Sequence, residues 1–317
     1  MQGQPAKPAP VYKEAPFFKR LAIDFQKHKY KYLLILPIIV YLILFCYKPM
    51  YGLVIAFKNY RPTRGIWGSN WVGFLWFETF FKDPYFWRLL RNTFTISGLT
   101  ILFGFPAPII LALLLNEVRS NKFKRTVQTI TYMPYFISLV VTCSLLKIYC
   151  MENGLFPQIM ELFGAQRQNL LANPKYFYPI YILSDIWQGI GWNSIIYLAA
   201  LSGIDQEQYE AARIDGANRL QQVIHITLPG LMPTITILFI LRMGNILNVG
   251  YEKILLLYNP STYEVADVLS TYTYRTGLEN QQYSLYTAVV LFNTMVNVVF
   301  LLITNYISKK STESGLF

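Results

Sequence analysis

The sequence predicts an all-α membrane protein with six transmembrane helices. Of its 317 residues, 54% are hydrophobic and only 14% are charged, whereas soluble globular proteins carry about 25% charged residues. The apolar residues form six long blocks separated by polar segments, and a hydrocarbon core of about 30 Å requires about 20 residues per helix. Lipid offers the backbone no hydrogen-bond partner, so each block is expected to form a helix.

The six blocks follow one another along most of the chain. They cover residues 33–57, 92–115, 126–149, 177–201, 231–247 and 285–307. Lys48-Pro49 interrupts the first block, and Pro106 and Pro108 predict a distortion of the second, because proline removes a helical hydrogen bond. Together the blocks define a transmembrane domain spanning residues 33–308.

The basic residues predict that both termini lie in the cytoplasm. Cytoplasmic loops of membrane proteins collect Lys and Arg, and six helices place the tail 1–32, the second-to-third loop and the tail 309–317 on one side. These segments hold Lys7, Lys13, Lys19, Arg20, Lys27, Lys29, Lys31, Arg119, Lys122, Lys124, Arg125, Lys309 and Lys310. The segment 59–91 is also basic, but it is rich in Trp and Phe, so we interpret it as an outer interfacial segment.

Several function classes find little support in the composition. The net charge of +11 is normal for a membrane protein, and no basic stripe interleaved with aromatic residues indicates nucleic-acid binding. The sequence contains no GxxxxGK[ST] motif, so any ATP is expected to bind to a partner. His28 and His225 are the two histidines, too few and too far apart for an expected metal site.

A charged stretch, residues 203–229, separates the fourth and fifth apolar blocks. Asp205 is a suitable N-cap for a short helix, and Gly216 is typical of the position that follows a helix end. A second helix is expected from Asn218 until Pro229 stops it. From these residues alone, a surface that docks into a partner and an ordinary helical loop remain equally good interpretations.

The motif spacing in this stretch resembles the EAA motif of ABC-importer permeases, EAA-x3-G-x9-I-x-LP. Every fixed position is met, by Glu210, Ala211, Ala212, Gly216, Ile226, Leu228 and Pro229. The stretches FGFPAPIILALLLNE (103–117), GWNSIIYLAAL (191–201) and HITLPGLMPTI (225–235) are similar to oligosaccharide permeases related to the maltose importer, especially the branch importing complex or acidic oligosaccharides. The resemblance covers roughly residues 30–310, and residues 203–229 are hereafter the EAA loop.

This resemblance implies the type I ABC-importer permease fold in a bacterial cytoplasmic membrane. It implies that the EAA loop docks on an ATPase subunit, where Glu210 pairs with a basic residue, Ala211 and Ala212 permit close approach and Gly216 forms the bend; Asp215 is assigned to the same surface. It also implies two ATPase subunits that bind ATP and Mg, an extracytoplasmic sugar-binding protein and a second homologous permease, expected to differ from this one.

Polar residues inside the apolar blocks are candidates for the substrate pathway, since intramembrane polar groups are costly. Asp185, Gln188 and Trp192 stand at i, i+3 and i+7 and share a helix face, and they offer a sugar hydrogen bonds and ring stacking. A second set shares a face spanning about 120° if the fifth helix is continuous: Arg242, Asn245, Asn248 and Glu252.

Both sets have a structural alternative, because polar side chains also join membrane helices. In that alternative Arg242 pairs with Asp185 or Glu252. For Asn293 and Asn297 in the sixth block, helix packing is the favoured interpretation.

Other functions remain open at this point. A phosphate or amino-acid permease shares the coupling motif, a membrane-embedded enzyme requires convergent catalytic groups, and a scaffold requires only a docking loop. Arg242 and the basic outer segment suit an acidic oligosaccharide. The sequence names neither the sugar nor its length.

Overall fold

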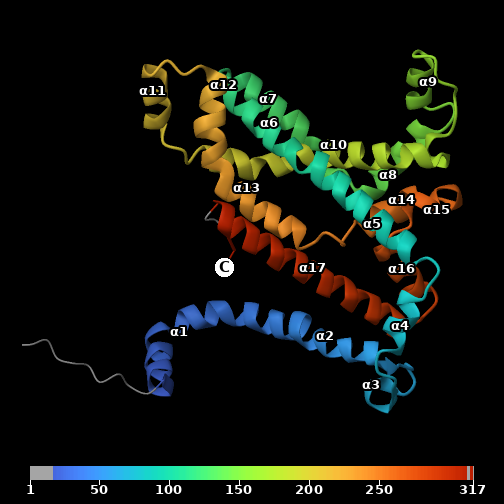
Figure 1. The fold of residues 1–317 in the computed structure, drawn as a ribbon. Helices are drawn as coiled ribbons and strands as arrows, with labels where there is room; N and C mark the ends of the chain where they lie inside the picture. Colours follow the sequence, from blue (N-terminus) through green and yellow to red (C-terminus); the bar gives the residue numbers. More distant parts are fainter. Residues whose placement is uncertain (1–16, 313–314, 317) are drawn as a thin grey trace, which may run out of the picture. The chain divides into compact units, whose positions relative to one another are not determined.

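The computed structural model describes residues 17–312, 315 and 316, which divide into two units at residues 54 and 55 (Figure 1). Nearly all described elements are helices, which confirms the predicted all-α class. A short antiparallel hairpin was not predicted. It pairs β1 (Lys58–Asn59) with β2 (Asn70–Trp71), and Lys58 lies opposite Trp71.

The first unit is a long helical segment. Helix α1 (Phe17–Tyr41) is followed by a π-helical segment (Leu42–Tyr47), α2 (Lys48–Met50) and a 3-10 segment (Tyr51–Phe57). The backbone leaves helical geometry at His28, with φ −122° and ψ 25°. Helix α1 thus extends into the predicted tail 1–32, whose first 16 residues lie outside the described residues.

The second unit contains seven helices of twelve or more residues: α5 (Phe86–Leu99), α6 (Pro106–Glu117), α7 (Asn121–Tyr132), α8 (Leu139–Cys150), α10 (Pro174–Leu201), α13 (Leu228–Met243) and α17 (Tyr283–Thr312). Its shorter helices are α3 (Gly65–Gly68), α4 (Leu75–Phe81), α9 (Leu155–Glu161), α11 (Gln206–Ile214), α12 (Arg219–Gln222), α14 (Tyr251–Leu257), α15 (Tyr263–Ala266) and α16 (Leu269–Tyr274). Helix α13 lies beside α17, and α6 packs on α10 (Figure 1). The EAA loop with α11 lies at one end of this unit, and α14–α16 lie at the other (Figure 1).

Within residues 17–312, five helical segments are long and apolar enough to span a membrane: Lys27–Phe57, Phe86–Glu117, Leu139–Glu161, Arg219–Met243 and Tyr283–Ser311. They correspond to five of the six predicted spans. The remaining one, residues 177–201, forms the 28-residue helix α10. Its polar residues, among them Asp185 and Gln188, make it less apolar than the other five.

The third predicted span, residues 126–149, is not one continuous helix. Helix α7 ends at Tyr132, a 3-10 turn covers Met133–Phe136, and α8 begins only at Leu139. Pro134 lies in the turn, and Ser138 caps α8 by accepting a hydrogen bond from the Val141 amide. Proline and a capping serine favour a helix boundary over a helix interior.

The predicted stop at Pro229 is wrong, and the fifth span begins earlier than residue 231. Helix α12, a π-helical turn (Val223–Thr227) and α13 form one helical segment, Arg219–Met243. Pro229 lies in the first turn of α13, directly after the π-helical turn. The π-helical turn lets the chain continue, because the Leu228 amide bonds to the Val223 carbonyl.

A second π-helical turn accounts for the distortion predicted near Pro106. It covers Thr100–Gly104 between α5 and α6, and the Phe105 amide donates to the Thr100 carbonyl at 3.0 Å. The second span also begins at Phe86, six residues before the predicted start.

Candidate functional site

The EAA loop contains the short helix α11 (Gln206–Ile214), capped at both ends as the sequence predicted. The Asp205 side chain accepts a hydrogen bond from the Glu207 amide at 3.0 Å and so caps α11. At its other end Gly216 has φ +82°, a conformation that is costly for residues with a Cβ. The Ala217 amide bonds to the Ala212 carbonyl at 2.8 Å and the Gly216 amide to the Arg213 carbonyl at 3.1 Å, which is a Schellman motif.

Side-chain contacts fix α11 against the helix that follows. The Tyr209 hydroxyl lies 3.0 Å from the Thr227 hydroxyl, and Asn218 forms a capping box with Gln221 at the start of α12. The loop is therefore a two-helix unit with defined geometry rather than an irregular connection.

The motif residues divide into three places on this unit. Glu210 and Ala211 are exposed on α11. A hollow of about 280 Å³ lies between the two helices, and Ala212, Asp215, Gly216 and Ile226 all line it. Leu228 and Pro229 lie in the first turn of α13. Ile214, on α11, is 87% exposed, and an apolar side chain so open to solvent is compatible with a partner surface.

A polar cavity of about 400 Å³, here the α14 cavity, lies at the other end of the second unit. It is formed by α5, α10, the end of α13 and α14. Five of the seven predicted pathway residues line it: Asp185, Arg242, Asn245, Asn248 and Glu252.

A second cavity of about 570 Å³, here the α6 cavity, adjoins the first. Trp192 lines it, and Asp185, Arg242 and Asn245 line both cavities. The Trp192 ring also stacks on Tyr135, with centroids 4.6 Å apart and planes at 5°. An aromatic face beside hydrogen-bonding side chains is a surface suited to a sugar ring.

The cavity residues after Met243 do not share one helix, although the prediction assumed a continuous one. Helix α13 ends at Met243 and a turn-rich segment, 244–250, leads to α14. Its backbone is held from three directions. Ser97 donates to the Ile246 carbonyl, the Leu247 amide donates to Asn297 at 3.0 Å, and Ser270 donates to the Val249 carbonyl at 3.0 Å.

Gln188 is placed apart from the other predicted pathway residues. Its amide donates to the Ile137 carbonyl at 3.1 Å, at the break between α7 and α8. Gln188 lines neither the α14 nor the α6 cavity, so its contact joins α10 to this break.

Lys253, which the sequence did not single out, lies in the wall of the α14 cavity. Its ammonium donates to the Tyr181 carbonyl at 3.1 Å and to Asp185 Oδ1 at 3.3 Å, and lies 4.7 Å from the centre of the Tyr181 ring. Its side chain is 5% exposed, whereas that of Asp185 is 46% exposed. No motif or periodicity marks Lys253; its burial arises from packing on residues about 70 positions away.

Arg242 does not pair with Asp185 or Glu252, as the structural alternative required. Asp185 is paired with Lys253 instead. Arg242 is exposed, and its side chain makes no hydrogen bond or ion pair with the residues that the structure describes.

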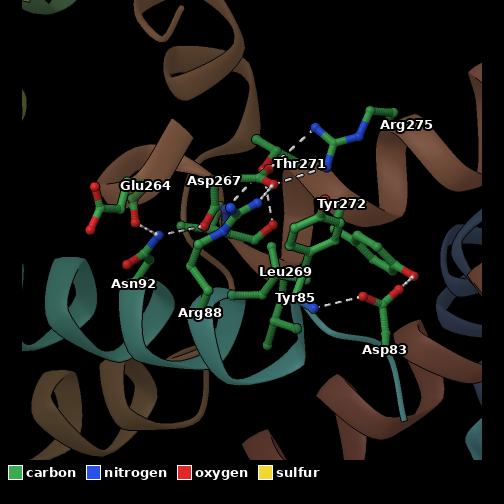
Figure 2. A network of polar contacts seen from close by, with 12 residues as sticks. Asp83, Tyr85, Arg88, Asn92, Glu264, Asp267, Leu269, Thr271, Tyr272 and Arg275 are labelled. Atoms are coloured by element: carbon green, nitrogen blue, oxygen red, sulfur yellow. Dashed lines mark hydrogen bonds and ion pairs between the residues drawn. The ribbon is translucent and has the colours of Figure 1, made fainter. Parts of the chain in front are cut away.

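A polar network braces α5 against α15 and α16 (Figure 2). The Asp267 carboxylate accepts from Arg275 at 2.9 Å, from Thr271 at 2.8 Å and from Arg88 at 3.5 Å. Asn92 donates to the carbonyls of Glu264 and Asp267, both at 2.9 Å. These contacts fix α15 and α16, which follow α14, the helix that carries Lys253.

The same network includes Tyr272, which donates to Asp83 at 2.7 Å (Figure 2). Burial and this hydrogen bond to a carboxylate raise the pKa of Tyr272 far above its ordinary value. The hydroxyl therefore keeps its proton and remains a donor throughout the physiological range. No group of three or more His, Cys, Asp and Glu among the described residues is placed to hold a metal ion.

Residues 104–313 match the model of the family described as binding-protein-dependent transport system inner membrane component. The chain belongs to this family. Permeases of this family are the transport subunits of ABC importers, and the five apolar helices agree with a multi-pass inner membrane protein.

Several relatives of this permease are named for sugar transport. It is 44% identical over 314 residues to the polygalacturonan/rhamnogalacturonan transport system permease protein YteP of Bacillus subtilis (strain 168), covering 99% of this chain and 98% of YteP. It also matches a crystal structure of a bacterial ABC transporter involved in the import of the acidic polysaccharide alginate, with a TM-score of 0.85 and 44% identity over 92% of this chain and 99% of that one.

A further solved structure is a bacterial alginate ABC transporter in complex with an alginate pentasaccharide-bound periplasmic protein. Its TM-score is 0.86 at 44% identity, and it covers 94% of this chain and all of the other. The chain is thus a permease of an oligosaccharide ABC importer with the type I fold. The amino-acid, phosphate, enzyme and scaffold alternatives are not retained.

Proposed function

We propose that this permease imports acidic oligosaccharides across the bacterial cytoplasmic membrane. The proposal rests chiefly on one observation: the α14 cavity contains both a buried lysine, Lys253, and an exposed arginine, Arg242, that makes no hydrogen bond or ion pair with the described residues. Arg and Lys bind carboxylates through charge-assisted hydrogen bonds. The similarity to the alginate transporters supports the same substrate class.

The path of the sugar follows the two adjoining cavities. Asn248 donates to Asn245 at 3.1 Å, and Asn245 donates to the Leu241 carbonyl at 3.0 Å, so each amide offers only its remaining donor and acceptor positions to hydroxyl groups. Trp192 offers a ring face, and Arg242 lines both cavities. Gln188 is left out of this path because it binds the Ile137 carbonyl. Glu252 lines the α14 cavity and restricts where a carboxylate can lie.

Partner subunits complete the importer in this proposal. Two ATPase subunits bind ATP and Mg, and the EAA loop docks on one of them through Glu210, Ala211 and the hollow beside Ala212. A second, different permease forms the other half of the pathway, and a sugar-binding protein delivers the substrate. Helix α10 also crosses the membrane, as the fourth of six spans, and both termini lie in the cytoplasm. Tags at both termini accessible only from outside intact cells would refute this topology.

The substrate class is tested by uptake into proteoliposomes that contain the complete complex and its binding protein. The probes are an oligosaccharide of galacturonate units and its carboxyl-reduced, neutral form of equal length. We expect ATP-dependent uptake of the acidic form at least about tenfold faster, the factor that one charge-assisted hydrogen bond supplies. Uptake restricted to the neutral form would contradict the proposal.

A further inference from the structure

Lys253 and Asp185 form an ion pair with two unequal partners. The lysine is almost completely enclosed, with 5% of its side chain exposed, whereas the aspartate presents 46% of its side chain to the cavities. An enclosed ammonium is costly unless an anion and hydrogen-bond acceptors compensate it. Here the compensation comes from the Tyr181 carbonyl, the Tyr181 ring and a single oxygen of Asp185.

The contact with Asp185 is the weakest part of this arrangement. The distance of 3.3 Å exceeds the 2.7–2.9 Å of a typical ammonium–carboxylate hydrogen bond. The Asp267 carboxylate, by contrast, receives Arg275 at 2.9 Å and Thr271 at 2.8 Å and is completely buried. Asp185 therefore leaves Lys253 at a smaller loss than a saturated, buried pair would require.

An exchange also requires that the cavity attract an incoming anion, and the α14 cavity provides two cations for this. Lys253 and Arg242 line the same α14 cavity as Asp185. The guanidinium of Arg242 has no hydrogen bond or ion pair within residues 17–312, so its planar set of donors is available for a carboxylate. A substrate carboxylate that replaces Asp185 on Lys253 would thus gain a second cation.

We propose that Lys253 determines the charge selectivity of the pathway, with Asp185 occupying the position of a substrate carboxylate until the substrate arrives. This inference rests on the proposed import of acidic oligosaccharides and adds the residue that selects them. A uronate carboxylate exchanges with Asp185 on the Lys253 ammonium and is shared with Arg242. A neutral sugar has no carboxylate to exchange with Asp185, so the Lys253–Asp185 ion pair stays intact in its presence.

The experiment compares uptake of a galacturonate oligosaccharide with uptake of its partly methyl-esterified form by the complete complex in proteoliposomes. Both forms are delivered by the same binding protein to wild type and variants, so its own preference cancels in the comparison. We expect Lys253→Gln to lower the acid-to-ester uptake ratio about tenfold, the factor for one hydrogen bond to a charged group. Lys253→Arg is expected to restore most of the ratio, because it retains the charge.

Two further variants keep the result interpretable. Arg242→Gln removes an exposed side chain that makes no hydrogen bond or ion pair with the described residues, so its complex is expected to assemble. It is expected to lower the same uptake ratio, and it can be measured even if Lys253→Gln reduces the yield of complex. Lys147→Gln removes an exposed cation of α8 that lines neither cavity, and it should leave the ratio at the wild-type value.

An unchanged ratio in an active Lys253→Gln complex, whatever its absolute rate, would overturn the inference while wild type still imports the acid. If Lys253→Gln yields no active complex, an unchanged ratio in Arg242→Gln would overturn it. If the wild-type complex imports only neutral sugars, the proposed function fails and this inference fails with it. The two failures are therefore distinguishable from the wild-type measurement alone.

Discussion

Asp185 and Asp267 are both aspartates in polar networks, but their surroundings give them different roles. Asp267 is completely buried, and its carboxylate accepts hydrogen bonds from two arginines and a threonine. Asp185 is half exposed and has one ion-pair contact at 3.3 Å. A carboxylate with saturated, buried partners fixes structure, whereas one with a long contact beside a cavity is free to exchange.

The residue scale also shows what a sequence reveals about a site. The motif identified the EAA loop residues by their spacing, and polarity within apolar blocks identified Arg242 and Asn245. Lys253 was not predicted as a site residue, because it follows the fifth apolar block, where a lysine is not unusual. Its burial depends on Tyr181 and Asp185, which no local pattern connects to it.

Glu210 carries the first functional prediction at this scale. It is exposed on α11, so Glu210→Lys is expected to leave folding intact. In the proposed docking, it places a cation against the basic residue that the motif resemblance assigns to the ATPase. Like charges in an interface cost several kcal/mol. ATP hydrolysis stimulated by the loaded binding protein should therefore fall by roughly tenfold or more in the assembled complex.

Glu207→Lys provides the matched control, since Glu207 is an exposed acid of the same helix outside the motif. We expect this variant to retain at least about half of the stimulated hydrolysis, because a single charge in the first turn changes helix stability by only about 0.3–1 kcal/mol. Equal hydrolysis rates in the two variants would remove Glu210 from the docking surface.

At the scale of elements, the order of the helices was predictable from the sequence, but their interruptions were not. The prolines predicted a helix distortion near Pro106 and a helix end at Pro229. In the structure both places are π-helical turns within continuing helices, because one extra residue in a turn accommodates the missing amide. The break between α7 and α8 was not predicted, because the block 126–149 was taken as one span although Pro134 lies within it.

Close packing of α10 on α7 depends on one glycine. A Cβ at Gly191 would lie 2.2 Å from the Thr131 carbonyl oxygen, a distance that backbone atoms cannot accommodate without moving. Gly191→Ala is therefore expected to lower the free energy of unfolding by about 1–3 kcal/mol, measured as a lower melting temperature of the purified complex.

Gly98→Ala serves as the control for this substitution. Gly98 lies in α5, and a Cβ there meets no atom within 4 Å, while alanine favours helix over glycine by about 1 kcal/mol. Its melting temperature should equal or exceed that of wild type. If the Gly191→Ala complex has the same melting temperature as wild type, α7 and α10 are less closely packed than described.

At the scale of the whole molecule, the proposed function assigns ATPase docking and sugar passage to different parts of the second unit. Helix α11 of the EAA loop lies at one end, and α14 lies toward the other (Figure 1). The α14 cavity is lined by two cations, Arg242 and Lys253, and by two acids, Asp185 and Glu252. The all-α class, the permease family and the capped helices of the EAA loop were predictable from the sequence. The shared cavity was not, because three tertiary contacts hold the segment 244–250 where a continuous helix was expected.

The most direct test of this account asks whether sugar passes Asn245, which is exposed and lines both cavities. A photo-crosslinking amino acid replaces Asn245 in the complete complex, and in a control it replaces Leu183, which is exposed on α10 and lines neither cavity. During ATP-driven import of a radiolabelled acidic oligosaccharide, we predict label on this chain at position 245 and background label at position 183. Active import with no label at 245, or equal label at both positions, would contradict the assignment of these cavities as the sugar pathway.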